Sequence, residues 1–142
     1  MLTVEAKPEN AAVAKAVVEY AGVQDRVEVF GGRLAEDTLA DLYAALGQRP
    51  ADLIFMDHFK DCYKPDLQAM EELGLLRKGT VVVADNVVYP GAPGYLEYVD
   101  TANGRYTTEL LPAAFEYEQK WKSDWDGPKA DALSVSIYNG RD

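Results

Sequence analysis

Residues 53–86 read LIFMDHFKDCYKPDLQAMEELGLLRKGTVVVADN, and this stretch decides the fold class. Residues 53–56 and 80–84 are continuous apolar runs, which are typical of strands in a parallel sheet covered by helices on both faces. Between them, residues 65–73 fit a helix that ends at Gly74. A strand, a helix and a second strand at this spacing predict a right-handed parallel unit.

The same alternation precedes this stretch. Residues 2–5 and 27–30 fit short strands, and each is followed by a helical pattern that stops at a glycine, Gly22 or Gly47. The apolar positions of these two helices are Ala12, Val13, Ala16, Val17 and Tyr20, then Leu39, Leu42, Tyr43 and Leu46. The sequence therefore predicts an α/β protein with a doubly wound, mostly parallel, Rossmann-like sheet.

The last third of the chain has a different pattern. Pro93 starts a short helix, and residues 105–111, 115–121 and 132–138 look like strands. Residues 123–131 are polar and include Gly127-Pro128, which indicates a turn. We expect an antiparallel hairpin that closes the sheet edge, within a single domain over residues 1–142.

Composition limits the possible partners. The 142 residues carry a net charge of −10, which argues against a nucleic-acid surface and favours a small-molecule partner. Cys62 is the only cysteine, so an internal disulfide is excluded, and we expect a reducing, cytoplasmic location. No apolar run approaches the roughly 20 residues of a membrane span.

Polar side chains directly follow the two apolar runs. Asp57 follows residues 53–56, and Asp85 and Asn86 follow residues 80–84. If the two strands are neighbours, these side chains converge at the carboxyl ends of the strands. Two carboxylates and an amide oxygen suit Mg²⁺ better than zinc. Lys60 then becomes a candidate base, because a nearby divalent cation disfavours its charged form.

Each of these residues also has a simpler explanation. Asp57 alone would suit a turn or a helix cap, and Lys60 alone would be a solvated surface charge. His58, the single histidine, has no partner at the spacing of a metal site or catalytic triad, so we expect a packing or hydrogen-bonding role.

Glu5 ends the first strand, where nucleotide-binding α/β folds place the acid that binds ribose hydroxyls. Those folds have a glycine-rich turn about 20 residues earlier. Four residues precede Glu5, so we expect the first βα unit to be missing. Residues 91–94 contain Pro93 and lack the G-x-G-x-x-G order, which favours a loop bend.

Three motifs together resemble the catechol O-methyltransferase family. They are MDHFKD at residues 56–61, LLRKGT at residues 75–80 and ADNV at residues 84–87. The resemblance runs from residue 1 to about residue 116, with a weaker match at residues 137–140. It covers only the later part of the family's fold.

The resemblance implies that a methyl group is transferred from S-adenosylmethionine to one hydroxyl of a catechol with the help of Mg²⁺. Lys60 matches the base that takes the phenolic proton, and Glu116 matches the acid that holds the other hydroxyl. The matched magnesium ligands are Asp57, Asp85 and Asn86. The matched catechol contacts are Phe59, Lys60, Asn86, Pro90 and Glu116, and the matched donor contacts are Val4, Glu5, Ala6, Gly32, Asp57 and His58.

Two alternatives remain at this stage. The chain departs from the family at Leu34 and Ala35, where polar donor contacts are usual, and in lacking the donor loop. An inactive fragment or binding module that retains the metal and catechol half-site is therefore possible, with its sheet completed by a partner chain or by self-association. An aspartate after an apolar strand also suits a phosphoacceptor domain, but here Glu5 is followed by Ala6 and not by a second acid.

Overall fold

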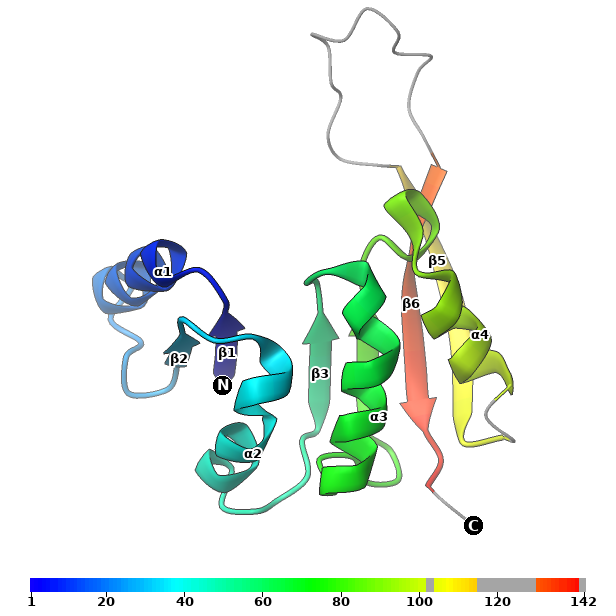
Figure 1. Cartoon of the computed structure of the whole chain (residues 1–142), viewed down its shortest axis with the longest axis horizontal. Coiled ribbons are helices and arrows are strands. Elements are labelled where there is room, and N and C mark those ends of the chain that lie inside the picture. Colours follow the sequence, from blue (N-terminus) through cyan, green and yellow to red (C-terminus); the bar gives the residue numbers. More distant parts are fainter. Residues whose placement is uncertain (102–103, 115–129, 141–142) are drawn as a thin grey trace, which may run out of the picture. The chain divides into compact units, whose positions relative to one another are not determined.

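A computed structural model of the chain describes residues 1–101, 104–114 and 130–140. The chain divides into two compact units, Met1–Arg49 and Pro50–Asp142. Each contains its own sheet, and the order of the elements is the alternation of strands and helices that the sequence predicts (Figure 1).

The first unit contains β1 (Leu2–Glu5), α1 (Pro8–Tyr20), β2 (Glu28–Gly31) and α2 (Ala35–Ala45). Strands β1 and β2 pair in parallel, with Leu2 opposite Glu28 and Glu5 opposite Gly31. Helix α1 approaches β2 closely, because a Cβ atom on Gly31 would lie 2.3 Å from Cβ of Ala11. Glycine at position 31 therefore allows the helix to pack on the strand.

The apolar stripe predicted for α1 is not the side that is buried in this unit. The buried side chain is that of Ala11, whereas Val13, Val17 and Tyr20 are exposed. A sheet of two strands offers little surface to a helix, and the small side chain of Ala11 allows the close contact with Gly31.

The second unit contains the remaining elements. They are β3 (Leu53–Met56), the 3₁₀ turn η1 (Lys60–Cys62), α3 (Tyr63–Leu73), β4 (Val81–Ala84), the irregular turn η2 (Val87–Gly91), α4 (Pro93–Thr101), β5 (Tyr106–Ala114) and β6 (Ala130–Tyr138). Helix α3 begins two residues before Pro65, because proline is tolerated in the first turn of a helix. It ends, as predicted, at Gly74, whose φ of 79° is in the left-handed region.

The sheet of the second unit has the order β3-β4-β6-β5. Strands β3 and β4 are parallel, and β6 runs antiparallel to both β4 and β5. The predicted antiparallel hairpin at the sheet edge is therefore confirmed, with β5 as the outer strand. Of the other segments predicted there, residues 115–121 lie outside the described residues. The same is true of the predicted 123–131 turn, except for Ala130 and Asp131, which belong to β6.

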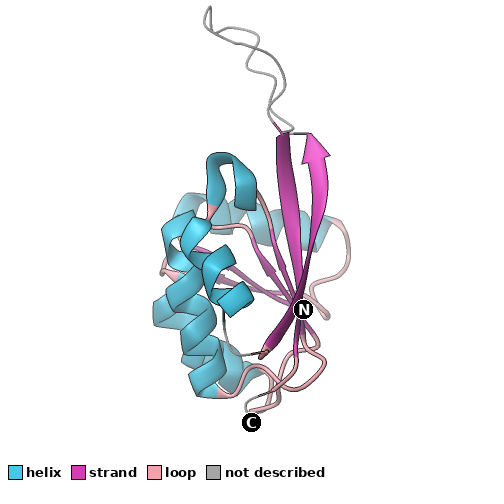
Figure 2. Cartoon of the chain, turned by 90° about the vertical axis from the view of Figure 1, so that its right-hand side faces the viewer, coloured by secondary structure: helices cyan, strands magenta, loops and turns pink. Residues whose placement is uncertain are grey.

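Helices α3 and α4 lie side by side on one face of this sheet (Figures 1 and 2). The side chains of Met56, Leu67 and Val82 are buried in this layer. Burial alternates along β3, and Leu53 and Phe55 remain 61% and 59% exposed. Within the described part of the second unit, helices α3 and α4 thus cover one face of this strand.

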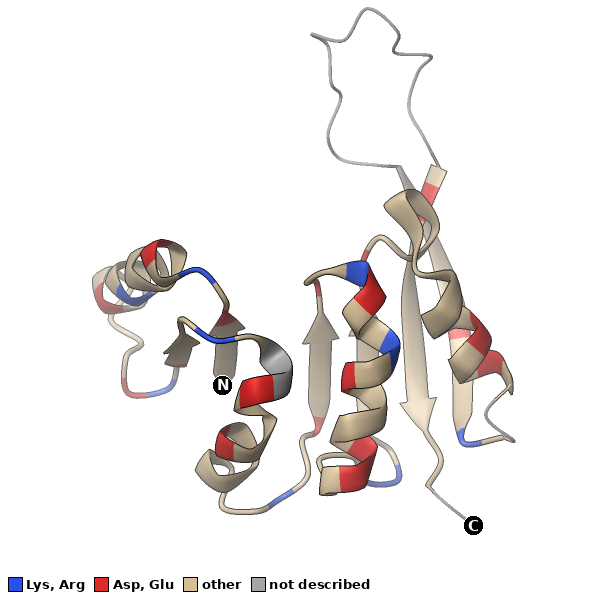
Figure 3. Ribbon diagram, viewed as in Figure 1, with Lys and Arg blue, Asp and Glu red and all other residues tan. Residues whose placement is uncertain are grey.

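Acidic residues outnumber basic ones, 24 to 14, and Figure 3 shows Asp or Glu on each of α1 to α4. No helix in the described part of the chain is long and apolar enough to cross a membrane.

Candidate active site

The candidate site of the second unit lies at the carboxyl ends of β3 and β4. These strands are parallel neighbours with Met56 opposite Ala84, so the residues that follow them are brought together. The backbone N–H of Asp85 donates a 3.0 Å hydrogen bond to the carbonyl oxygen of Met56. The convergence predicted for the two strand ends is therefore present.

The ammonium group of Lys60 joins the two strand ends. It donates hydrogen bonds to Oδ1 of Asp57 at 3.2 Å and to Oδ1 of Asn86 at 3.3 Å. The Lys60 side chain, which starts in η1, is only 16% exposed. Two side-chain oxygen atoms from residues that follow different strands thus face a single positive charge, and this arrangement suits a bound cation.

A third partner of Lys60 was not predicted from the sequence. The ammonium also donates a 2.6 Å hydrogen bond to Oη of Tyr63, the first residue of α3. The Tyr63 hydroxyl has carbonyl acceptors on both strand ends, Met56 at 2.8 Å and Asp85 at 3.0 Å. Tyr63 therefore connects Lys60 to the backbone of both strands.

Burial, followed by the nearby negative charges of Asp57 and Asp85, raises the pKa of Tyr63 well above its usual value. The hydroxyl therefore stays protonated at neutral pH. It can accept a hydrogen bond from Lys60 and still donate its own proton to a carbonyl.

Asn86 has an unusual backbone conformation, with φ 54° and ψ 41° in the left-handed region, which asparagine tolerates better than most residues. The amide Nδ2 of Asn86 donates a 2.8 Å hydrogen bond to Oδ2 of Asp131 on β6. Oδ1 of Asp85, in contrast, accepts a hydrogen bond from the backbone N–H of Asn86 at 2.8 Å. Sequence analysis did not identify Asp131.

The three predicted metal ligands supply two carboxylates and one amide oxygen. Within the described ranges, no three His, Cys, Asp or Glu side chains group in a way that could hold a metal ion. The predicted set depends on Asn86 as its third member, and Oδ1 of Asn86 and Oδ1 of Asp57 already meet at the Lys60 ammonium. These oxygen donors match the chemistry that Mg²⁺ prefers.

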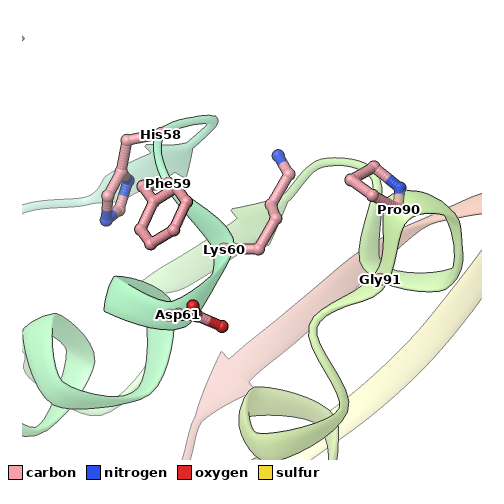
Figure 4. Close-up of a pocket in the computed structure, with 6 residues that line it drawn as sticks. All are labelled: His58, Phe59, Lys60, Asp61, Pro90 and Gly91. Carbon is pink, nitrogen blue, oxygen red and sulfur yellow. The ribbon is translucent and has the colours of Figure 1, made fainter.

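An open pocket of about 400 Å³ lies beside Lys60. Its lining residues are His58, Phe59, Lys60, Asp61, Pro90 and Gly91. Figure 4 shows Lys60 between Phe59 and Pro90, which are the two residues expected to form the walls of a catechol slot. The structure thus brings these two side chains together at one pocket.

His58 has a carboxylate neighbour that the sequence did not reveal. Its Nε2 lies 2.8 Å from Oδ2 of Asp66, a buried residue of α3, although the angle is not that of a hydrogen bond. Asp66 is eight positions away, outside the spacings that sequence analysis considered. The expected packing or hydrogen-bonding role of His58 stays a prediction, and Asp66 is a neighbour that the sequence did not reveal.

The predicted donor contacts, except Asp57 and His58, lie in the first unit. Glu5 ends β1, and its Oε1 accepts a 2.9 Å hydrogen bond from the backbone N–H of Lys7. The carbonyl oxygen of Glu5 accepts a 3.0 Å hydrogen bond from the N–H of Gly32, so these two predicted residues are neighbours. Val4 is half-buried and Ala6 is exposed. Glu116, the predicted acid, lies outside the described residues.

Comparison with known proteins identifies the family. A model of the O-methyltransferase family matches residues 1–110. The chain belongs to the O-methyltransferase family. It is 41% identical over 140 residues to catechol O-methyltransferase of Sus scrofa, and 46% identical over 140 residues to catechol O-methyltransferase B of Danio rerio. The resemblance found in the three sequence motifs is confirmed.

Solved O-methyltransferase structures agree with this assignment and with the predicted α/β fold class. A putative O-methyltransferase from Klebsiella pneumoniae matches with a TM-score of 0.73 and 26% identity, covering 98% of this chain and 61% of that one. An O-methyltransferase from Bacillus cereus in complex with SAH matches with a TM-score of 0.72 and 27% identity, covering 96% of this chain and 61% of that one.

The chain spans only part of these O-methyltransferases. The alignments include 99% of this chain, 69% of the Sus scrofa protein and 49% of the Danio rerio protein. The chain therefore represents about half to two thirds of the length of its curated relatives.

Proposed function

We propose that this chain forms the part of a catechol O-methyltransferase that binds Mg²⁺ and the catechol. The observation that carries the proposal is the meeting of Oδ1 of Asp57 and Oδ1 of Asn86 at the Lys60 ammonium, beside the pocket. The whole reaction would transfer a methyl group from S-adenosylmethionine to one catechol hydroxyl.

The residues that would hold Mg²⁺ are Asp57, Asp85 and Asn86. Bound there, the ion would orient the catechol oxygens and favour loss of the phenolic proton. Asp85 Oδ1 accepts the Asn86 N–H, which keeps its carboxylate at the end of β4. Asp57 is half-exposed, so its carboxylate is accessible from solvent.

Lys60, in its neutral amine form, would accept the phenolic proton at Nζ. The phenolate oxygen then forms a bond to the methyl carbon while the bond from that carbon to the donor sulfur breaks, and the electron pair returns to sulfur. The products are a catechol methyl ether, S-adenosylhomocysteine and protonated Lys60. Tyr63 holds Nζ beside the strand ends, which favours a reproducible geometry for the proton transfer.

Phe59 and Pro90 would enclose the catechol ring from opposite sides of Lys60, as their places in the pocket suggest. Glu116 would hold the second hydroxyl. On the donor side, Glu5 would bind the ribose hydroxyls, with Val4, Ala6, Gly32 and His58 as neighbouring contacts. A cytoplasmic location, and a partner chain or second copy that completes the sheet, stay predictions.

Calorimetric titration of the purified chain tests the proposal. Mg²⁺ is titrated first, then S-adenosylmethionine with Mg²⁺ present, and methylation of a simple catechol is followed by mass spectrometry. We expect saturable Mg²⁺ binding that Asp57→Asn weakens and Asp100→Asn, a change at an exposed position on α4, leaves unchanged.

The outcomes separate the active enzyme from the half-site. Mg²⁺ and donor binding with turnover support a complete catalyst. Mg²⁺ binding without donor binding indicates that this chain supplies only the metal and catechol half-site. Absence of Mg²⁺ binding by the folded chain would refute the proposed metal site.

A further inference from the structure

The carboxylate of Asp131 collects four N–H donors at the edge of the candidate site. Its Oδ2 accepts from Nδ2 of Asn86 at 2.8 Å. Its Oδ1 accepts from the backbone N–H groups of Val88 at 3.2 Å, Tyr89 at 2.9 Å and Ala132 at 2.8 Å. Asp131 is only 6% exposed. One buried side chain on β6 thus holds both Asn86 and the start of η2.

The two ends of the Asn86 amide face different partners. Oδ1 faces the Lys60 ammonium at 3.3 Å, and Nδ2 faces Asp131 at 2.8 Å. An ammonium can only donate hydrogen bonds, and an ionised carboxylate can only accept them. Both neighbours therefore favour the same orientation of the amide, with its oxygen toward Lys60 and Asp57.

We propose that Asp131 is a positioning residue, which fixes the Asn86 amide so that its oxygen, and not its nitrogen, faces the site where Mg²⁺ would bind. The metal part of this inference rests on the proposed function. The orientation of the amide does not, and it can be measured separately. A magnesium ligand that is held by a partner on the neighbouring strand β6 is pre-organised before the ion arrives.

The charge state of Asp131 is consistent with this role. Burial by itself would raise its pKa, but the hydrogen bonds from Asn86 and from the N–H groups of Tyr89, Ala132 and Val88 outweigh burial and lower it. In all four of these hydrogen bonds the Asp131 carboxylate is the acceptor.

The variant Asp131→Asn distinguishes the positioning role from a purely structural role in holding η2. In the variant Asp131→Asn, the new amide oxygen can still accept from the three backbone N–H groups that hold η2 and β6. The new amide nitrogen would then face Nδ2 of Asn86, which places two donors opposite each other. Rotation of the Asn86 amide would relieve this contact only by turning its nitrogen toward Lys60, so either orientation leaves two donors opposed. The amide oxygen is then no longer fixed toward the metal position.

The test compares four proteins by calorimetric titration with Mg²⁺: the natural chain, Asp131→Asn, Asn86→Asp, and the double variant. We expect Asp131→Asn to weaken Mg²⁺ binding by about 10-fold to 100-fold, the range seen when an outer partner of a metal ligand is lost. Asn86→Asp alone places two carboxylates together and should also bind more weakly. In the double variant, the amide of residue 131 donates to the carboxylate of residue 86, and affinity should return.

The double variant distinguishes positioning of the Asn86 amide from simple support of η2. A purely structural role of Asp131 does not require the affinity for Mg²⁺ to return in the double variant. Natural affinity in Asp131→Asn, or no recovery in the folded double variant, would overturn the proposal. Thermal unfolding of all four proteins reports any loss of folding.

Nuclear Overhauser effects from the Asn86 side-chain amide protons give a readout that needs no metal. In the natural chain, we expect contacts to the β-protons of Asp131 and none to the ε-protons of Lys60. Contacts to Lys60 in the natural chain would refute the positioning role, even if Asp131→Asn failed to fold. If the chain does not bind Mg²⁺ but shows the expected contacts, the proposed metal site fails and the positioning of Asn86 stands.

Discussion

The hydroxyl of Tyr63 lies 2.6 Å from the ammonium nitrogen of Lys60 and is itself completely buried. Hydrogen bonds to the carbonyl oxygens of Met56 and Asp85 anchor this hydroxyl to the ends of β3 and β4. The Lys60 ammonium also lies 4.8 Å from the centre of the Tyr63 ring. The position of the candidate base is therefore linked to the strand ends through one tyrosine.

Tyr63→Phe should lower methyl transfer and leave the overall fold intact, because the ring still packs and only the hydroxyl is lost. We expect kcat to fall about 10-fold with a smaller change in KM, since the loss affects the position of the base. The unfolding free energy should fall by about 1–3 kcal/mol, because the carbonyl oxygens of Met56 and Asp85 lose this buried donor. Steady-state kinetics and urea denaturation measure both quantities.

Tyr20→Phe is the matched control for this change, because the Tyr20 side chain is 96% exposed. It should alter neither kcat nor stability. A Tyr63→Phe variant with natural kcat would show that Lys60 does not depend on this hydroxyl.

Lys60→Ala should separate turnover from metal binding. Removal of the proposed base is expected to lower kcat by about 100-fold or more, the scale of general base catalysis. The affinity for Mg²⁺ should not fall, because the ammonium shares Oδ1 of Asp57 and Oδ1 of Asn86 with the proposed metal. Calorimetry and methylation assays are compared with Lys78→Ala, a change at an exposed position. Unchanged turnover in Lys60→Ala would remove this residue from the mechanism.

Glu71→Ala should destabilise the second unit strongly. The Glu71 carboxylate is buried and accepts hydrogen bonds from Arg105 at 2.6 Å, Tyr98 at 2.8 Å and Tyr106 at 2.5 Å. Its loss leaves the partly buried Arg105 without this ionic partner and two tyrosine hydroxyls without this acceptor. We expect the unfolding free energy to fall by about 3 kcal/mol.

Glu72→Ala is the control for this variant, because Glu72 follows directly on α3 and is exposed. Urea denaturation should show less than about 0.5 kcal/mol of change for it. Similar losses in both variants would mean that helix propensity, and not the buried carboxylate, determines the effect.

The sequence predicted those parts of the fold that depend on local patterns. The bounds of β1 and β3 were predicted correctly. β1 ends at Glu5, and the apolar run of β3 stops directly before Asp57. The meeting of Asp57, Asn86 and Lys60 was also predictable. Residues that directly follow two parallel neighbouring strands must lie at one edge of the sheet.

The sequence did not predict the parts of the site that depend on long-range register. Asp131 reaches Asn86 only because β6 pairs antiparallel with β4, 45 positions along the chain. The contact between Tyr63 and Lys60 depends on the 3₁₀ turn η1, which continues directly into α3. The exposure of the apolar stripe on α1 depends on how small the sheet of the first unit is. None of these features has a characteristic residue spacing.

Alkaline conditions should destabilise the chain through its buried tyrosines. Burial, followed by the hydrogen bond to Glu71, raises the pKa of Tyr106 above its usual value, so the folded state keeps this proton longer than the unfolded state does. The contribution of Tyr106 to the unfolding free energy is fully present below the pKa of about 10 that tyrosine has in the unfolded chain. It is lost as the pH rises above that value.

Above pH 10, each such tyrosine should lower the unfolding free energy by up to about 1.4 kcal/mol per pH unit. Urea denaturation at pH 9, 10 and 11 measures the slope of the unfolding free energy against pH. Tyr106→Phe should make this slope shallower, because the variant lacks the tyrosine proton that only the unfolded state loses in this range. Tyr20→Phe should keep the natural slope, because Tyr20 is exposed in the folded state. Equal slopes in the natural chain and in Tyr106→Phe would mean that Tyr106 ionises as readily in the folded chain as in the unfolded one.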